Sequence, residues 1–100
     1  MGGGDEDLGK KLIGNFLRKL WASDTKPQTI IFYNSAVKLL ADGSPCLDAV
    51  EAVSKAGVDL VACGTCVGVY ALEDKLKFGR ISDMQTIVNI MMTSEKVITI

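Results

Sequence analysis

The residues best suited to take part in a reaction are the two cysteines of the run Cys63-Gly64-Thr65-Cys66. An apolar segment ends at Cys63 and residues with helical spacing follow, so Cys63 should end a strand and Cys66 should lie in the first turn of a helix. Unpaired N–H groups and the positive end of the helix dipole favour a thiolate at such a position. We therefore expect at least one of these thiols to have a pKa below the free value of ~8.5.

The two residues between the cysteines fit a binding turn. Gly64 lets the backbone come close to a bound group, and Thr65 can cap the helix while offering a hydroxyl. The turn could hold a persulfide, whose terminal sulfur is an anion at neutral pH, or close a reversible Cys63–Cys66 disulfide. Simple packing of Cys63 in the core is the alternative, since cysteine is among the most buried residue types. For Cys46, early in an ordinary helix, packing is the expected role.

Histidine is absent from the sequence. This excludes Ser-His-Asp and Cys-His pairs and any zinc site that uses histidine within one chain. A four-cysteine zinc site within the chain is excluded as well, because the chain has three cysteines. We expect no metal and no cofactor, and a nucleophile activated by backbone dipoles or by Lys and Arg.

Length and charge narrow the class of protein. A chain of 100 residues predicts one domain spanning 1–100. A formal net charge of −1 without a Lys/Arg-rich run argues against nucleic acid as a partner. No apolar stretch approaches the ~18 residues of a membrane span, so no membrane association is expected. The acidic, Gly-rich start is the reverse of a signal peptide, which predicts a cytoplasmic protein.

The first predicted element is an amphipathic helix over 5–22, with Gly4 or Asp5 as its cap. Its buried stripe should comprise six apolar side chains, Leu8, Leu12, Ile13, Phe16, Leu17 and Leu20. Beyond it, strand-like runs are predicted at 29–33, 58–63, 78–81 and 96–100. Helices should separate them at 37–41, 44–57 (capped by Ser44), 64–77 and 82–92 (opened by a Ser82–Gln85 capping box).

Strands that alternate with helices indicate βαβ units, here a three-layer α/β/α fold with a mainly parallel sheet of about four strands. Sheets of this kind bind ligands beyond the carboxyl ends of their strands. Three segments should meet at that edge: Asn34-Ser35, Cys63–Cys66 and Ser82-Asp83. Asn34 and Ser35 are therefore predicted to line a pocket beside the thiols.

Four stretches resemble, in the same order, the C-terminal domain of YedF-type proteins, which belong to the DsrE/DsrF-like superfamily of sulfur-handling proteins. They are GDEDLGKKL at 4–12, IIFYNSAVKL at 30–39, GSP at 43–45, and CGTC at 63–66 with Leu72. The resemblance covers nearly the whole chain. It implies a three-layer α/β/α fold, a homo-oligomer, and a strand-end cysteine that carries sulfur as a persulfide. By this pattern Cys63 matches the sulfur-accepting position and Cys66 is an additional thiol; the family name also links it to selenium metabolism.

Two features depart from the family pattern. Many relatives place Arg-Gly after the cysteines where this chain has Tyr70-Ala71, so an anion-holding arginine is not expected there. Relatives also begin with a strand before the Gly-Asp-Glu stretch, and YedF proteins add an N-terminal sulfur-carrier domain. Without that first strand, we expect one of three outcomes: the strands at 29–33 and 96–100 pair directly, another chain supplies a strand, or the sequence starts inside a longer gene.

The function expected from these residues is that of a sulfur carrier or sulfurtransferase-like protein. Cys63 would accept sulfane sulfur from a protein donor or pass it to a protein acceptor, and Cys66 would resolve the persulfide or tune its pKa. Two alternatives remain open. One is a non-catalytic, oligomeric module that binds a small anion, and the other is a Cys63–Cys66 dithiol redox switch.

Overall fold

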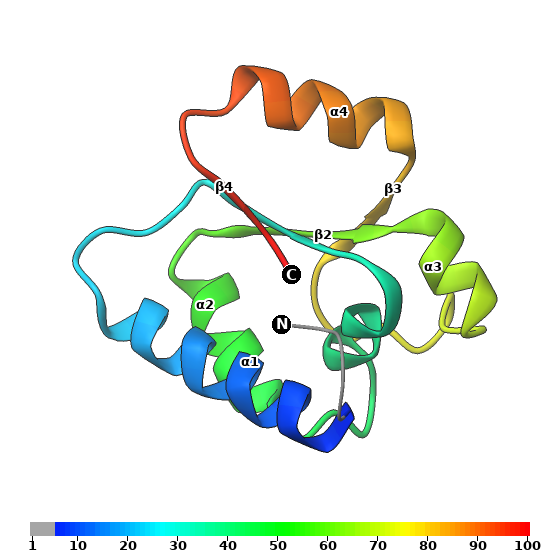
Figure 1. The fold of residues 1–100 in the computed structure, drawn as a ribbon, viewed down its shortest axis with the longest axis horizontal. Helices are drawn as coiled ribbons and strands as arrows, with labels where there is room; N and C mark the ends of the chain where they lie inside the picture. The colour runs from blue at the N-terminus through cyan, green and yellow to red at the C-terminus, as the bar shows by residue number, and fades with distance from the viewer. Residues whose placement is uncertain (1–5) are drawn as a thin grey trace.

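The computed structural model describes residues 6–100, so Gly4 and Asp5, predicted as the helix cap, lie outside the described residues. Helical segments and strands alternate along the chain, with two helical segments in succession between the first and second strands (Figure 1). They are α1 (Glu6–Ala22), β1 (Thr29–Phe32), the 3₁₀ helix η1 (Asn34–Leu40), α2 (Leu47–Lys55), β2 (Asp59–Cys63), α3 (Gly64–Val69), β3 (Arg80–Ser82), α4 (Met84–Thr93) and β4 (Val97–Thr99).

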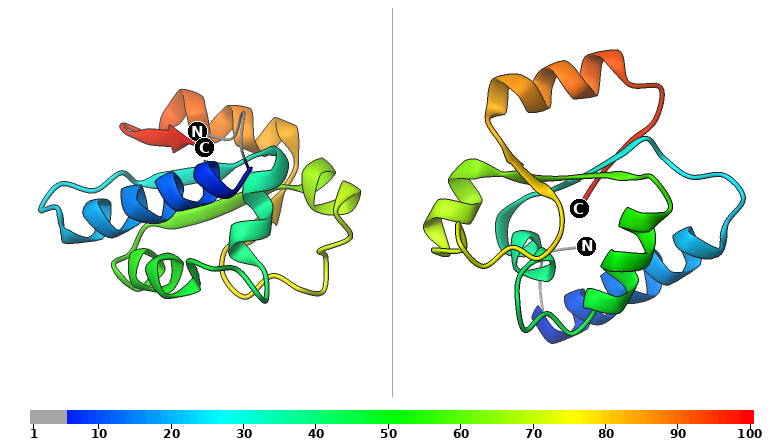
Figure 2. Two further views of the ribbon diagram at one scale, coloured as in Figure 1. Left: turned by 60° about the horizontal axis from the view of Figure 1, so that its bottom comes forward. Right: turned by 180° about the vertical axis from the view of Figure 1, so that it is seen from behind.

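The four strands form one parallel sheet in the order β3-β2-β1-β4. α1 and α2 lie on one face of this sheet and α4 lies on the other, which gives three layers (Figures 1 and 2). The predicted α/β fold class is confirmed. β1 pairs directly with β4, with Thr29 opposite Val97 and Ile31 opposite Thr99. This is the first of the three outcomes expected without the strand that begins the proteins this chain resembles.

The core is divided by the alternation of side chains along the strands. On β1, Ile30 and Phe32 belong to a cluster that includes Leu17 of α1 and Val50 of α2. Ile31, between them, belongs to a second cluster beneath α4. All four β1 residues are buried, which explains why the strand reads as a continuous apolar run rather than an alternating one.

The apolar stripe of α1 is only partly buried, contrary to the prediction. Ile13 and Leu17 are 3% and 0% exposed, whereas Leu8 and Leu12 are 55% and 47% exposed. The reason is the position of the helix, because α1 packs mainly against α2 rather than across the sheet. Only the middle of the stripe reaches the core.

Two predicted helix caps are wrong by one or two residues. α2 begins after Cys46 rather than after Ser44, whose hydroxyl instead accepts a hydrogen bond from the Cys46 N–H at 3.3 Å. The cap of α4 is Asp83 rather than Ser82: its carboxylate accepts a hydrogen bond from the Thr86 N–H at 2.7 Å, which lowers the pKa of Asp83. The Cys46 side chain makes no cap hydrogen bond at α2, whereas at α4 the Asp83 carboxylate takes the capping role predicted for Ser82.

The predicted helix at 64–77 ends much earlier, at Val69. The Leu72 N–H donates to the Val67 carbonyl at 3.0 Å, and the Ala71 N–H donates to the Gly68 carbonyl at 3.1 Å. These two bonds form a Schellman motif, which requires a left-handed residue just past the helix. Ala71 supplies it with φ 54°, where glycine is the usual residue, so the sequence carries no stop signal at this point.

Replacing Ala71 with glycine is expected to raise the free energy of unfolding by about 0.5–1 kcal/mol, because the left-handed conformation is strained for alanine and not for glycine. Urea denaturation measures the change. Ala56→Gly is the matched control: Ala56 ends α2 with φ −75°, where glycine relieves no strain and should destabilise the fold. Equal shifts for the two variants would contradict the strained conformation at Ala71.

Candidate thiol site at the carboxyl edge of the sheet

The three segments predicted to meet at the carboxyl edge of the sheet do so. β2 ends at Cys63, which lies opposite Ser82 at the end of β3. Asn34 follows the adjacent strand β1, and its backbone N–H lies 3.1 Å from the Cys66 sulfur. η1, α3 and the start of α4 gather at this end of the molecule (Figure 1). The parallel sheet thus brings together residues 32 positions apart in the chain.

The cysteines of this edge differ in accessibility. Cys63 is 4% exposed and packs in the cluster beneath α4, while Cys66, in the first turn of α3, is partly exposed. The two thiols are near enough for Cys63 to influence the pKa of Cys66, and both are free rather than joined in a disulfide. Cys46 is 2% exposed in the opposite core cluster, so its expected packing role is confirmed.

Asn34 contributes its backbone to the site. Its φ of 51° lies in the left-handed region, which asparagine tolerates better than most residues. Asn34 is the first residue of η1, two positions after the end of β1. In this conformation its backbone N–H donates a hydrogen bond to the Cys66 sulfur. The backbone conformation at position 34 therefore explains the choice of asparagine there without any ligand.

The pKa of the Cys66 thiol is raised, opposite to the direction expected for a helix N-terminus. Burial is the largest cause, and contact with Cys63 adds to it. The N–H of Asn34 acts in the other direction by stabilising the thiolate, but it does not offset the burial. α3 has only six residues, so its dipole is a weak source of thiolate stabilisation.

Tyr33 borders the site and was not singled out from the sequence. Burial raises the pKa of its phenol, and the nearby Cys63 and Cys66 raise it further. The phenol therefore stays protonated beside the thiols and can donate a hydrogen bond. The sequence does carry a signal for this placement. Tyr33 ends the predicted strand directly before Asn34, and it lies on the same face of the strand as the buried Ile31.

The remaining predicted binding residues have plainer environments. A Cβ at Gly64 would lie 3.2 Å from the Ser82 carbonyl oxygen, so this glycine allows α3 to start close against β3. Thr65 is exposed within the first turn of α3 and does not cap it, because Cys63 occupies the cap position without a side-chain hydrogen bond. Ser35 is partly exposed at the start of η1. Of the four, Asn34 is the one brought into hydrogen-bond contact with a thiol.

The described residues contain no cluster of three or more side chains suited to a metal ion. Within residues 6–100, no helix has both the length and the apolar character needed to cross a bilayer. Fold and site together define a parallel α/β protein with a dithiol at the carboxyl edge of its sheet. Comparisons with protein-family models, with curated proteins and with solved structures find no match.

Proposed function

We propose that this protein is a cytoplasmic sulfur carrier or sulfurtransferase-like protein that holds sulfane sulfur as a persulfide on Cys63. The observation that carries the proposal is the placement of two neighbouring free thiols at a strand end, beside a backbone N–H that lies 3.1 Å from the Cys66 sulfur and donates to it. A homo-oligomer and a protein sulfur donor or acceptor belong to the same proposal.

Loading and release are exchange reactions at sulfur. The Cys63 thiolate attacks the terminal sulfur of a donor persulfide, a new S–S bond forms, and the donor leaves as a thiolate that takes up the proton. Cys66 can then attack the Cys63 sulfur, which closes a Cys63–Cys66 disulfide and releases the sulfane sulfur as hydrosulfide. In this second step the two thiols are oxidised and the sulfane sulfur is reduced, so no further oxidant is needed.

The experiment is mass spectrometry of the protein after incubation with glutathione persulfide. We expect a mass increase of one sulfur atom on the peptide that contains Cys63 in the wild type and in Cys46→Ser. Cys63→Ser should lose the loading while remaining folded, and Cys66→Ser should keep the added sulfur longer because it cannot be released as a disulfide. A Cys63→Ser variant that loads like the wild type would contradict the proposal.

A dithiol redox switch is the second candidate, and the closeness of the free thiols Cys63 and Cys66 favours it. In this case the same incubation should yield the Cys63–Cys66 disulfide with no persulfide at any time point. If neither product forms, the remaining alternative is the module that binds a small anion without covalent chemistry.

A further inference from the structure

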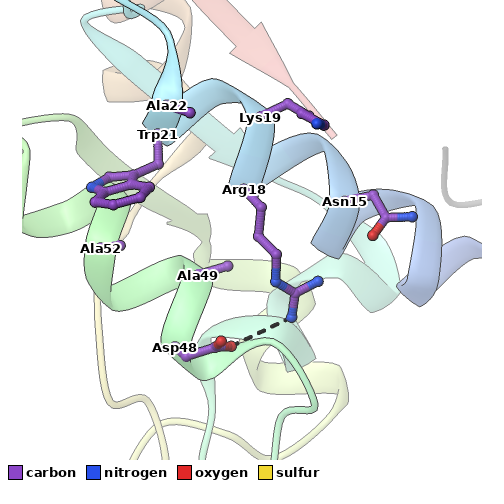
Figure 3. A pocket seen from close by; sticks show the side chains of 8 residues that line it. All are labelled: Asn15, Arg18, Lys19, Trp21, Ala22, Asp48, Ala49 and Ala52. Atoms are coloured by element: carbon purple, nitrogen blue, oxygen red, sulfur yellow. Dashed lines mark ion pairs between the residues drawn. The ribbon is translucent and has the colours of Figure 1, made fainter.

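A pocket lies between α1 and α2, away from the thiols. Its volume is about 710 Å³, and its lining includes Trp21 and Arg18 from α1 and Asp48, Ala49 and Ala52 from α2. Figure 3 shows Trp21 and Arg18 extending from α1 toward α2, with Ala52 beside the indole and Ala49 between the indole and Arg18. We call this cavity the Trp21 pocket.

The apolar part of the Trp21 pocket suits a flat ligand. Trp21 is 53% exposed, a large fraction for an indole, and it stands beside the short side chains of Ala49 and Ala52. A second cavity of about 380 Å³ also has Trp21 in its lining. Short side chains leave the indole open, and an open indole offers a stacking surface to any planar π system.

The polar part of the pocket favours an anion. The charged residues of the lining are Arg18, Lys19 and Asp48. Figure 3 shows Arg18 directed toward Asp48, whereas Lys19 extends from α1 away from α2, so Arg18 is the cation that faces the pocket. The Arg18 guanidinium lies 3.5 Å from the Asp48 carboxylate, with the two side chains 49% and 77% exposed. An ion pair this open to water is weak, and a guanidinium has enough N–H donors to bind a second oxyanion.

Arg18 and Trp21 are three residues apart on α1, so they share a face of the helix. A ligand whose ring stacks on Trp21 can therefore place a charged group on Arg18. We propose that the Trp21 pocket binds a planar aromatic ligand with one anionic group, either a carboxylate or a phosphate. The lining residues Trp21 and Ala22 are the last two of α1, and Figure 1 shows this end of α1 on the side where β2 begins, opposite to α3. The proposal therefore does not depend on the sulfur chemistry.

The test uses the fluorescence of Trp21, which is the only tryptophan in the chain and therefore reports directly on the pocket. The probes are AMP and benzoate, with adenosine and benzamide as their uncharged counterparts. We expect at least one anion to change the emission saturably, and to bind about tenfold or more tightly than its uncharged counterpart, because it gains a charge-assisted hydrogen bond. Saturation by AMP alone identifies a nucleotide-like ligand, and saturation by benzoate alone identifies an aromatic carboxylate.

Variants assign the binding to the named side chains. Arg18→Gln should weaken the anion about tenfold and leave the uncharged compound unchanged. Trp21→Leu, followed by calorimetry, should lose binding. Arg80→Gln is the matched control, since Arg80 is another exposed arginine paired with a carboxylate, that of Asp59 at 2.9 Å, but on β3. The proposal is overturned if neither anion saturates the signal at millimolar concentration, or if Arg18→Gln and Arg80→Gln behave alike.

Discussion

Replacing Phe32 with alanine is expected to lower the free energy of unfolding by about 3–5 kcal/mol. Phe32 is fully buried and is among the largest such side chains of the core. It lies on β1, which is hydrogen bonded to β2 on one side and β4 on the other, so the surrounding backbone cannot easily close over the cavity. A loss of this size is a large fraction of the ~5–15 kcal/mol by which a domain is stable.

Urea denaturation followed by circular dichroism measures this change, with the slope of the transition expected to stay constant. Phe16→Ala is the matched control, because Phe16 is a partly exposed phenylalanine on α1 and alanine favours helix. We expect that variant to lose less than about 1 kcal/mol. A comparable loss from both variants would show that β1 is not the centre of the core.

Much of the fold follows from patterns that extend along the chain. β1 and β2 are apolar on both faces, which only a sheet covered by helices on both sides satisfies, and this order of elements selects parallel pairing. Gly57 marked the end of α2 correctly, since its φ of 96° requires glycine. All of these signals can be read along the chain without knowing how the elements pack against one another.

The errors arise where several local solutions compete or where packing decides. Ser82 and Asp83 are both good caps, and only the geometry of the turn selects Asp83. The end of α3 at Val69 depends on a left-handed alanine, which no sequence rule anticipates. The exposure of Leu8 follows from the packing of α1 on α2, which is a tertiary property.

For the site, the sequence predicted which segments meet but not the environment of each atom. The meeting of Asn34 with Cys66 follows from parallel strands that end at the same edge. The direction of the Cys66 pKa shift does not, because it results from the balance between burial and a single N–H. That balance depends on how deeply the sulfur lies, which spacing along the chain does not reveal.

Cys66 is expected to react with iodoacetamide well before Cys63 and Cys46. Cys66 is partly exposed, whereas Cys63 and Cys46 are 4% and 2% exposed. The two buried thiols can react only when the fold opens locally. Alkylation followed by peptide mass spectrometry gives the order directly. Fastest labelling of Cys46 would contradict both the burial of that residue and the accessibility of the thiol site.

The pH dependence of the Cys66 reaction tests its electrostatic environment. Only the thiolate reacts, so a raised pKa should move the rate profile to higher pH than that of N-acetylcysteine measured alongside. At pH values below the pKa of Cys66 its alkylation rate should rise about tenfold per pH unit, because the fraction of Cys66 present as thiolate rises by the same factor.

Cys63→Ala separates the causes of that shift. The contact with Cys63 raises the pKa of Cys66, so its removal should move the profile back toward lower pH, while burial, the larger cause, keeps it above that of the free thiol. Cys46→Ser is the control and should leave the profile in place, because Cys46 is not among the groups that shift the pKa of Cys66. A Cys66 profile that lies below that of N-acetylcysteine would mean that backbone dipoles outweigh burial at this turn, and the thiolate would then be the resting form of the site.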